Sequence, residues 1–233
     1  MEDSEDEEIL LELSFEETRV LGSLIEKELT TPEYYPMSLN GLVNACNQKN
    51  NRLPRTNLDE DEVNQVIEEL RLKRLVHRVG LVGSRVPKFQ HNAEKELDLI
   101  KAERAILAEL LNRGPQTSGE LNTRASRMFT FDGISDVEET LQELMDREPS
   151  LVGNMDPASG QKGKRWFHKL APPPSLEELN DGSAVYVPAP DKRIDQLEEM
   201  TKEFTELKDE VEALRYQLRE LSDEFKNFRK QFD

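Results

Sequence analysis

Residues 57–89, NLDEDEVNQVIEELRLKRLVHRVGLVGSRVPKF, decide the fold that this sequence predicts. Val63, Val66, Ile67 and Leu70 recur at helical spacing and indicate a helix that begins near Asp59. The sequence then alternates apolar and polar side chains, is interrupted by two glycines, and resumes the alternation before its end. A helix followed by two short strands around a turn is the second half of a winged helix.

The start of this helix carries an unusual charge for a DNA-reading element. In helix-turn-helix proteins the equivalent helix enters the major groove with its N-terminal residues on base edges. Here those positions hold Asp59, Glu60, Asp61 and Glu62. Phosphates repel such carboxylates, and phosphate attraction supplies most non-specific DNA affinity. The predicted shape therefore favours a DNA reader, whereas the charge at the tip of the helix disfavours one.

The preceding residues complete a first winged-helix domain, which we expect to span residues 14–91. Ser14 and Glu17 have the spacing of a capping box at the start of a helix. The apolar face of that helix holds Val20, Leu21, Leu24 and Ile25. Ser38 is expected to cap a second, shorter helix.

Residues 92–171 repeat this plan and predict a second winged-helix domain. Apolar residues that match the first helix at an offset of 86 are Ile106, Leu107, Leu110 and Leu111. Residues 135–144 match residues 61–70 at an offset of 74. Candidate wing strands surround a basic turn at residues 156–164. Two divergent copies indicate tandem domains, because a solenoid needs about three or more repeats.

Three further segments flank the two domains. We expect residues 1–13 to be an acidic disordered tail and residues 172–192 to be a Pro-rich linker. Residues 193–233 carry apolar residues at the a and d positions of about five heptads, which predicts a coiled-coil helix. These positions are Leu197, Met200, Phe204, Leu207, Val211, Leu214, Leu218, Leu221, Phe225, Phe228 and Phe232.

The coiled coil predicts that the chain associates with itself as a parallel dimer or low oligomer. Flanking charges agree, because Glu203 and Lys208 occupy positions that pair between parallel helices. The alternative is a long helix that folds back onto its own domains. The phenylalanines in the seam leave the number of strands open.

Composition limits the classes of protein that fit. The single cysteine, Cys46, rules out an internal disulfide framework and a multi-cysteine zinc site. No apolar run is long enough to span a membrane and no signal peptide begins the chain, so we expect a cytoplasmic protein without membrane contact. The net charge is −17 but residues 14–91 are neutral overall, so local contact with an anion remains compatible with the sequence.

Residues 33–50, EYYPMSLNGLVNACNQKN, strongly resemble the signature of the YceH-like family of uncharacterised bacterial proteins. Residues 114–127, GPQTSGELNTRASR, are similar to the second motif of that family. The resemblance covers roughly residues 13–170 and implies two winged-helix domains in a bacterial cytoplasmic protein. It implies no established activity, and the acidic tail departs from the compact starts of the family.

The sequence predicts neither an enzyme nor a cofactor. His77, His91 and His168 are scattered over predicted strands, and the usual spacings of metal ligands are absent. Cys46 lies on the apolar face of a helix and is expected to be a small buried side chain.

Two functions remain open, and each has its candidate residues. The first is a dimeric scaffold that binds an unidentified protein partner, with a recognition surface around Tyr34, Tyr35, Asn44 and Asn47. The second is a DNA-binding regulator that contacts phosphates weakly through basic wings. The candidate contacts for that function are Arg52, Arg55, Arg78, Arg85, Lys88, Lys162, Lys164 and Arg165.

Overall fold

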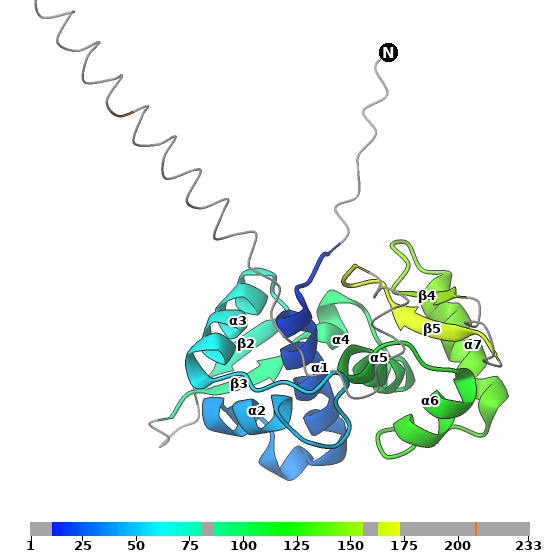
Figure 1. Cartoon of the computed structure of the whole chain (residues 1–233), viewed down its shortest axis with the longest axis horizontal. Coiled ribbons are helices and arrows are strands. Elements are labelled where there is room, and N and C mark those ends of the chain that lie inside the picture. Colours follow the sequence, from blue (N-terminus) through cyan, green and yellow to red (C-terminus); the bar gives the residue numbers. More distant parts are fainter. Residues whose placement is uncertain (1–10, 81–85, 156–162, 173–207, 209–233) are drawn as a thin grey trace, which may run out of the picture. The chain divides into compact units, whose positions relative to one another are not determined.

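The computed structural model describes residues 11–80, 86–155, 163–172 and 208 (Figure 1). Two compact units divide the chain between Tyr186 and Val187, and every described residue except Lys208 belongs to the first unit. The predicted coiled coil and nearly all of the predicted linker lie outside the described residues. The first unit is mainly helical, with small antiparallel sheets.

The first half of this unit has three main helices and a three-stranded antiparallel sheet in the order β1-β3-β2. Its elements are α1 (Phe15–Thr30), η1 (Pro32–Tyr34), β1 (Met37–Ser38), α2 (Leu39–Cys46), α3 (Glu60–Leu72), β2 (Val76–Val79) and β3 (Lys88–His91). The predicted capping box at Ser14 is confirmed, since its hydroxyl accepts from the Glu17 N–H at 3.2 Å. Asp59 caps α3 with Glu62 in the same way.

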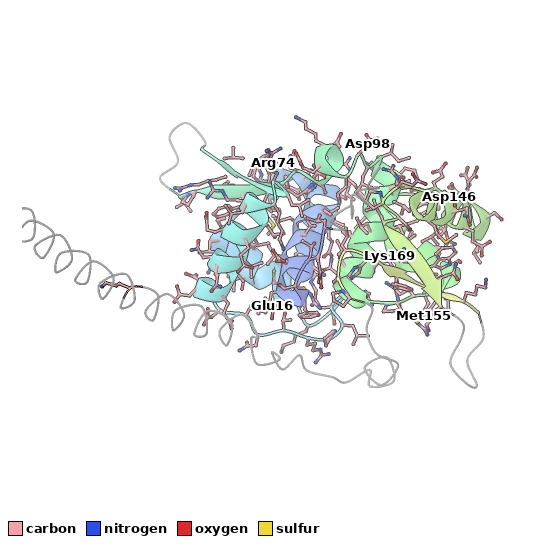
Figure 2. The ribbon with its side chains drawn as sticks, turned by 90° about the horizontal axis from the view of Figure 1, so that it is seen from above. Glu16, Arg74, Asp98, Asp146, Met155 and Lys169 are labelled. Atoms are coloured by element: carbon pink, nitrogen blue, oxygen red, sulfur yellow. The ribbon has the colours of Figure 1, made fainter. Side chains whose placement is uncertain are left out.

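The second half follows the same order of elements. These are α4 (Ala93–Glu96), α5 (Lys101–Arg113), α6 (Ser118–Ala125), α7 (Ile134–Met145), β4 (Val152–Met155) and β5 (Arg165–His168). Gln116 forms an antiparallel bridge with Trp166, so β5 lies between this residue and β4, as β3 lies between β1 and β2. The predicted repeat of the plan is therefore visible in the topology. Figure 2 shows the two halves with Arg74 just after α3 and Asp146 just after α7.

One ion pair occurs in equivalent positions of both halves. Glu17 in the first turn of α1 contacts Lys73 after α3 at 2.6 Å. Glu103, 86 residues later, contacts Arg147 after α7 at 2.7 Å, and Arg147 follows Lys73 by 74 residues. These offsets are those of the apolar repeat. Each pair therefore ties the start of the first helix of its half to the end of the third.

The two halves pack on each other through α1 and α5, which lie side by side in the unit (Figure 1). The apolar positions predicted for both helices are all buried, with exposures of 0–3%. Gly22 of α1 allows the close approach, because a Cβ atom at this position would lie only 2.8 Å from the Cβ of Leu111. The two predicted domains thus form one compact unit with a shared core.

The predicted extent of the acidic tail, residues 1–13, needs a correction at its end. Leu13 is buried and its N–H donates to the carbonyl oxygen of Leu170 at 2.7 Å. Leu11 packs against the core as well. An aliphatic side chain gains free energy on burial, so these last residues join the fold in spite of the carboxylate at Glu12.

The close approach of the helices predicts a cost for one added methyl group. Replacing Gly22 with Ala should lower the free energy of unfolding by about 1–3 kcal/mol, because α1 and α5 must separate. Urea denaturation of the full chain measures this. Gly119→Ala in α6 is the control, since its Cβ meets no heavy atom within 4 Å, and it should be neutral or slightly stabilising. Equal stability of the two variants would contradict the tight contact.

Candidate functional site

The predicted recognition surface divides into exposed and structural residues. Tyr34 is 73% exposed, and Asn44 is an exposed residue that donates to the Asn40 side chain. The hydroxyl of Tyr35 accepts from the His91 N–H at 2.6 Å. The side chain of Asn47 donates to the Leu58 carbonyl at 2.7 Å and accepts from the N–H of the same residue at 2.9 Å. Tyr35 and Asn47 therefore hold the fold together.

Arg52 is a correction to the predicted nucleic-acid contacts, because its side chain is fully buried. Its Nε donates to the Ala45 carbonyl at 3.0 Å and its Nη1 to the Asn51 carbonyl at 2.7 Å. The remaining nitrogen lies 2.5 Å from a carboxylate oxygen of Glu26 in α1. A guanidinium with these internal partners is a structural anchor of the loop between α2 and α3.

Four of the other predicted cations lie near the surface at two hairpins. Arg78 on β2 pairs with Phe89 and Val79 pairs with Lys88 on β3, so the side chains of Arg78 and Lys88 point to opposite faces of the hairpin. Lys164 is exposed just before β5, and Arg165 begins that strand with a partly exposed side chain. The remaining members of the set are Arg55, which is exposed, and Arg85 and Lys162, which lie outside the described residues.

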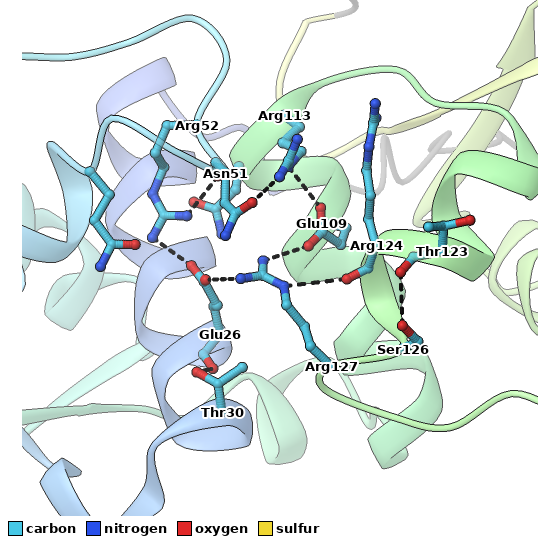
Figure 3. A network of polar contacts seen from close by, with 12 residues as sticks. Glu26, Thr30, Asn51, Arg52, Glu109, Arg113, Thr123, Arg124, Ser126 and Arg127 are labelled. Atoms are coloured by element: carbon cyan, nitrogen blue, oxygen red, sulfur yellow. Dashed lines mark hydrogen bonds and ion pairs between the residues drawn. The ribbon is translucent and has the colours of Figure 1, made fainter.

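The most extensive polar cluster of the described residues lies where the two halves meet (Figure 3). Two buried carboxylates face it, Glu26 from α1 and Glu109 from α5. Arg127, which follows α6, reaches between them and donates to Glu26 at 2.7 Å and to Glu109 at 2.6 Å. One guanidinium thus neutralises carboxylates from both halves.

The loop between α2 and α3 is fastened to the same cluster. The Leu53 N–H donates to the carbonyl of Asn112 at 2.9 Å, and the side chain of Arg113 donates to that of Asn51. Arg113 also lies 3.2 Å from Glu109. Together with the buried Arg52, these contacts fix the loop against α1 and α5.

Charges in the cluster shift the protonation equilibria of its members. Burial alone would raise the pKa of Glu26, but Arg52 and Arg127 outweigh it and hold that pKa below its usual range. For Arg113 burial lowers the pKa, and the neighbouring guanidiniums of Arg124 and Arg127 add to this effect against the opposing charge of Glu109. Glu26 is therefore held ionised, as an ion-pair acceptor.

A second polar cluster joins β3 to both central helices. Glu28 of α1 contacts the Nε2 of His91 at 2.9 Å and Arg104 of α5 at 3.1 Å. The other ring nitrogen of His91 accepts from the Ala93 N–H at 3.3 Å, so the proton lies on Nε2. Burial raises the pKa of Glu28, and contacts with His91 and Arg104 bring it below its usual range. His91 is a packed structural side chain.

Cys46 agrees with its predicted role as a buried side chain. It is fully buried, and burial raises the pKa of its thiol to about 11. Among the described residues, no group of three or more histidine, cysteine or acidic side chains is placed to hold a metal ion. No helix in this part of the chain is long and apolar enough to cross a membrane.

Comparison with known proteins agrees with the expected uncharacterised bacterial family. Residues 13–161 match the family model described as "Protein of unknown function, DUF480". The chain belongs to this family. A UPF0502 protein of Koribacter versatilis is 48% identical over 197 residues, which cover 82% of this chain and 90% of the relative. Another of Geotalea daltonii is 49% identical over 193 residues, covering 78% and 85%. A third, of Shewanella woodyi, is 39% identical over 219 residues, covering 91% and 100%.

The sequence of this DUF480 chain contains one signal for the central cluster that our reading of its periodicity missed. At the offset of 86, Ser23 corresponds to Glu109 and Glu26 to Asn112. All four are polar residues on buried helix positions, and Ser23 donates to Asn112 at 3.5 Å. Polar residues that recur at the same buried positions of α1 and α5 therefore indicate where the two halves contact each other.

The bridging role of Arg127 predicts a large loss of stability when this DUF480 chain lacks it. Arg127→Met should cost about 3–5 kcal/mol at neutral pH, because two buried carboxylates are left without their shared partner. Arg71→Met is the control, since the ion pair of Arg71 with Glu68 is exposed and should be worth at most about 1 kcal/mol. Equal losses in the two variants, measured by urea denaturation, would contradict the bridge.

The lowered pKa of Glu26 gives the pH dependence of this effect. Its ion pairs stabilise the parent protein above the ordinary pKa of 4.5, and this stabilisation is lost as pH falls through the lower folded value. Without Arg127 the buried charge of Glu26 is relieved by protonation. The difference in free energy of unfolding between Arg127→Met and the parent, measured by urea denaturation, should therefore shrink below about pH 4.5.

Proposed function

We propose that this DUF480 chain is a protein-interaction scaffold built from two winged-helix units, with no helix that reads DNA bases. The first half has the order helix, strand, helix, helix and hairpin, and the second half has the same order with the bridging residue Gln116 in place of the strand. This order supports the winged-helix assignment. Fold alone does not select a function, so the proposal depends on the chemistry of the exposed surfaces.

The outward faces of α3 and α7 carry this proposal. These helices occupy the position of the recognition helix in a winged helix. Their exposed residues include Glu60, Asp61, Glu62 and Glu68 on α3, and Glu138, Glu139 and Glu143 on α7. Insertion of either face into a groove would place several carboxylates beside phosphates. The cost of this repulsion favours a protein partner over DNA bases.

Local contacts keep the carboxylates of α3 in place. Asp59 and Glu62 accept from backbone N–H groups in the capping box, and Glu60 accepts from the side chain of Asn40 at 3.4 Å. Negative charge near a helix N-terminus is stabilised by the helix dipole. The outward carboxylates therefore stabilise the helix and suit a partner with basic side chains.

Self-association is part of the same proposal. The heptads of residues 197–232 would place two copies side by side and present each acidic helix face twice. Two linked faces bind a repeated or extended partner more tightly than one, because the second contact becomes intramolecular.

A DNA-binding regulator is the second candidate, and one observation favours it. Residues 70–93, which include β2 and β3, contain no Asp or Glu in a chain with 48 acidic residues. Arg78 and Lys88 both lie on this hairpin, with their side chains on opposite faces of it. Contact with phosphates through the hairpin would be independent of base sequence and weakened by salt.

Selection of the full chain against a random duplex pool tests the proposal. We expect no enriched sequence motif, because the faces of α3 and α7 repel DNA. Asn64→Ala with Gln65→Ala alters exposed polar groups of α3 and serves as the diagnostic variant. An enriched motif whose binding disappears in this variant would make the chain a conventional DNA reader and defeat the proposal.

The self-association has its own test. Leu214→Asp with Leu218→Asp puts charge into the predicted seam and should release monomers in sedimentation velocity. Ala213→Asp with Tyr216→Asp adds the same charge at outward heptad positions and should leave the oligomer intact. A parent chain that is monomeric at tens of micromolar would show that no such dimer forms.

A further inference from the structure

Basic side chains gather where the two halves meet, although the whole chain has a net charge of −17. We call this set the junction strip; its members are Lys27, Lys49, Arg113, Arg124, Arg127, Lys164 and Arg165, and the buried Arg52 lies beneath it. In the described part of the chain, the ion pairs of these residues go to three carboxylates, Glu26, Glu109 and Glu120. Together with Arg52 these cations number eight, and among the described residues they outnumber the three carboxylates that pair with them.

Contacts between neighbours make the strip continuous across α6. Arg165 at the start of β5 lies 3.2 Å from Glu120, and Arg124 lies 3.2 Å from the other oxygen of that carboxylate. Arg127 donates to the backbone carbonyl of Arg124 at 3.3 Å. Lys164 is exposed and directly precedes Arg165 in the chain, which brings this end of the strip to the second hairpin.

The other end of the strip reaches the loop between α2 and α3. Arg127 shares Glu26 with the buried Arg52 (Figure 3). Lys27 donates to the side chain of Gln48 at 3.3 Å, and the exposed Lys49 follows directly. The strip therefore runs from the second hairpin, across the junction, to a loop of the first half.

Several cations of the strip repel one another, although Glu26 and Glu109 raise the pKa of Arg127 in spite of its burial. Burial lowers the pKa of Lys27, Glu26 opposes this, and the charges of Arg52 and Arg127 lower the pKa further. The pKa of Arg113 is lowered in the same way by burial and by nearby guanidiniums. An anion placed over the strip would relieve this repulsion between like charges.

The elongated arrangement of the strip and its anchored hydrogen-bond donors indicate which kind of ligand it can bind. The side chains of Arg113, Arg124, Arg127 and Arg165 are 22–35% exposed, so they can meet a ligand while their internal contacts hold them in place. Guanidinium groups fit phosphate oxygens, and donors fixed in advance lose little entropy on binding.

We propose that the junction strip binds the phosphate backbone of a nucleic acid without reading its bases. This site lies apart from the acidic faces of α3 and α7, and it goes beyond the scaffold function. Neither proposal requires the other. The selection against a random duplex pool tests α3 and α7. The strength of binding to a duplex and its dependence on salt test the strip.

Fluorescence anisotropy of the full chain with labelled duplexes of two unrelated sequences tests the strip. We expect both duplexes to bind equally at low salt, with an affinity that falls steeply as salt rises. Lys49→Gln with Lys164→Gln removes the two exposed lysines and spares the buried clasp. The slope of log affinity against log salt should become shallower by about two, at about 0.9 per phosphate contact.

Lys95→Gln with Lys101→Gln is the matched control, because both lysines are exposed and lie outside the strip. It should leave affinity and slope close to the parent values. Absence of binding at low salt, or an equal effect of the control, would overturn the proposal. So would binding lost with Arg78→Gln and Lys88→Gln but retained without the strip lysines, which would assign the contact to the first hairpin. Binding of polyglutamate through the strip without binding of either duplex would assign the strip to acidic proteins instead.

Discussion

The contact between Glu26, Arg127 and Glu109 is the constraint on which the arrangement of the two halves depends. Two buried carboxylates from neighbouring helices repel each other, and burial alone already costs several kcal/mol per ion. Arg127 makes their burial tolerable by donating to both. The backbone at Arg127 must then lie beside the junction, and this fixes the path of the chain after α6. The close packing at Gly22 and the ion pairs of Arg127 with Glu26 and Glu109 therefore require the same short distance between α1 and α5.

Contacts within each half repeat, whereas contacts between the halves do not. Glu17 with Lys73 and Glu103 with Arg147 are equivalent pairs, and each holds the first and third helices of its own half. Across the junction, Ser23 donates a long hydrogen bond to Asn112. The corresponding pair is Glu109 and Glu26, the two carboxylates that Arg127 bridges. Each half packs its first helix against its third, so the same ion pair serves in both halves. The junction occurs only once in the chain, so its two equivalent positions can hold different side chains.

Local patterns predicted much of the fold. Apolar periodicity and capping residues located α1, α3, α5 and α7, because helix formation depends on neighbours a few positions apart. The same reasoning misplaced Arg52, which reads as a surface cation in a polar loop. Its burial depends on Glu26, and Arg127 reaches that carboxylate from 101 residues away. No period in the sequence encodes such a contact. Tyr35 shows the same limit, since it holds the backbone of His91, which lies 56 residues away in the sequence. Asn47 holds the backbone of Leu58, 11 residues away and beyond the end of its own helix.

Net charge is a poor guide to the surfaces of this chain because its charges are segregated. Screening limits interactions between exposed charges to about 8–10 Å at ordinary salt, so a ligand responds to the residues beneath it. Carboxylates dominate the outward faces of α3 and α7, and the N-terminus of α3 stabilises those in its first turn. Guanidiniums gather at the junction, where Glu26 and Glu109 need several donors each. The cations that bury two carboxylates thus leave an excess of positive charge at the surface. Folding of the junction itself creates the cationic surface, and anion binding there would depend on the two halves being docked.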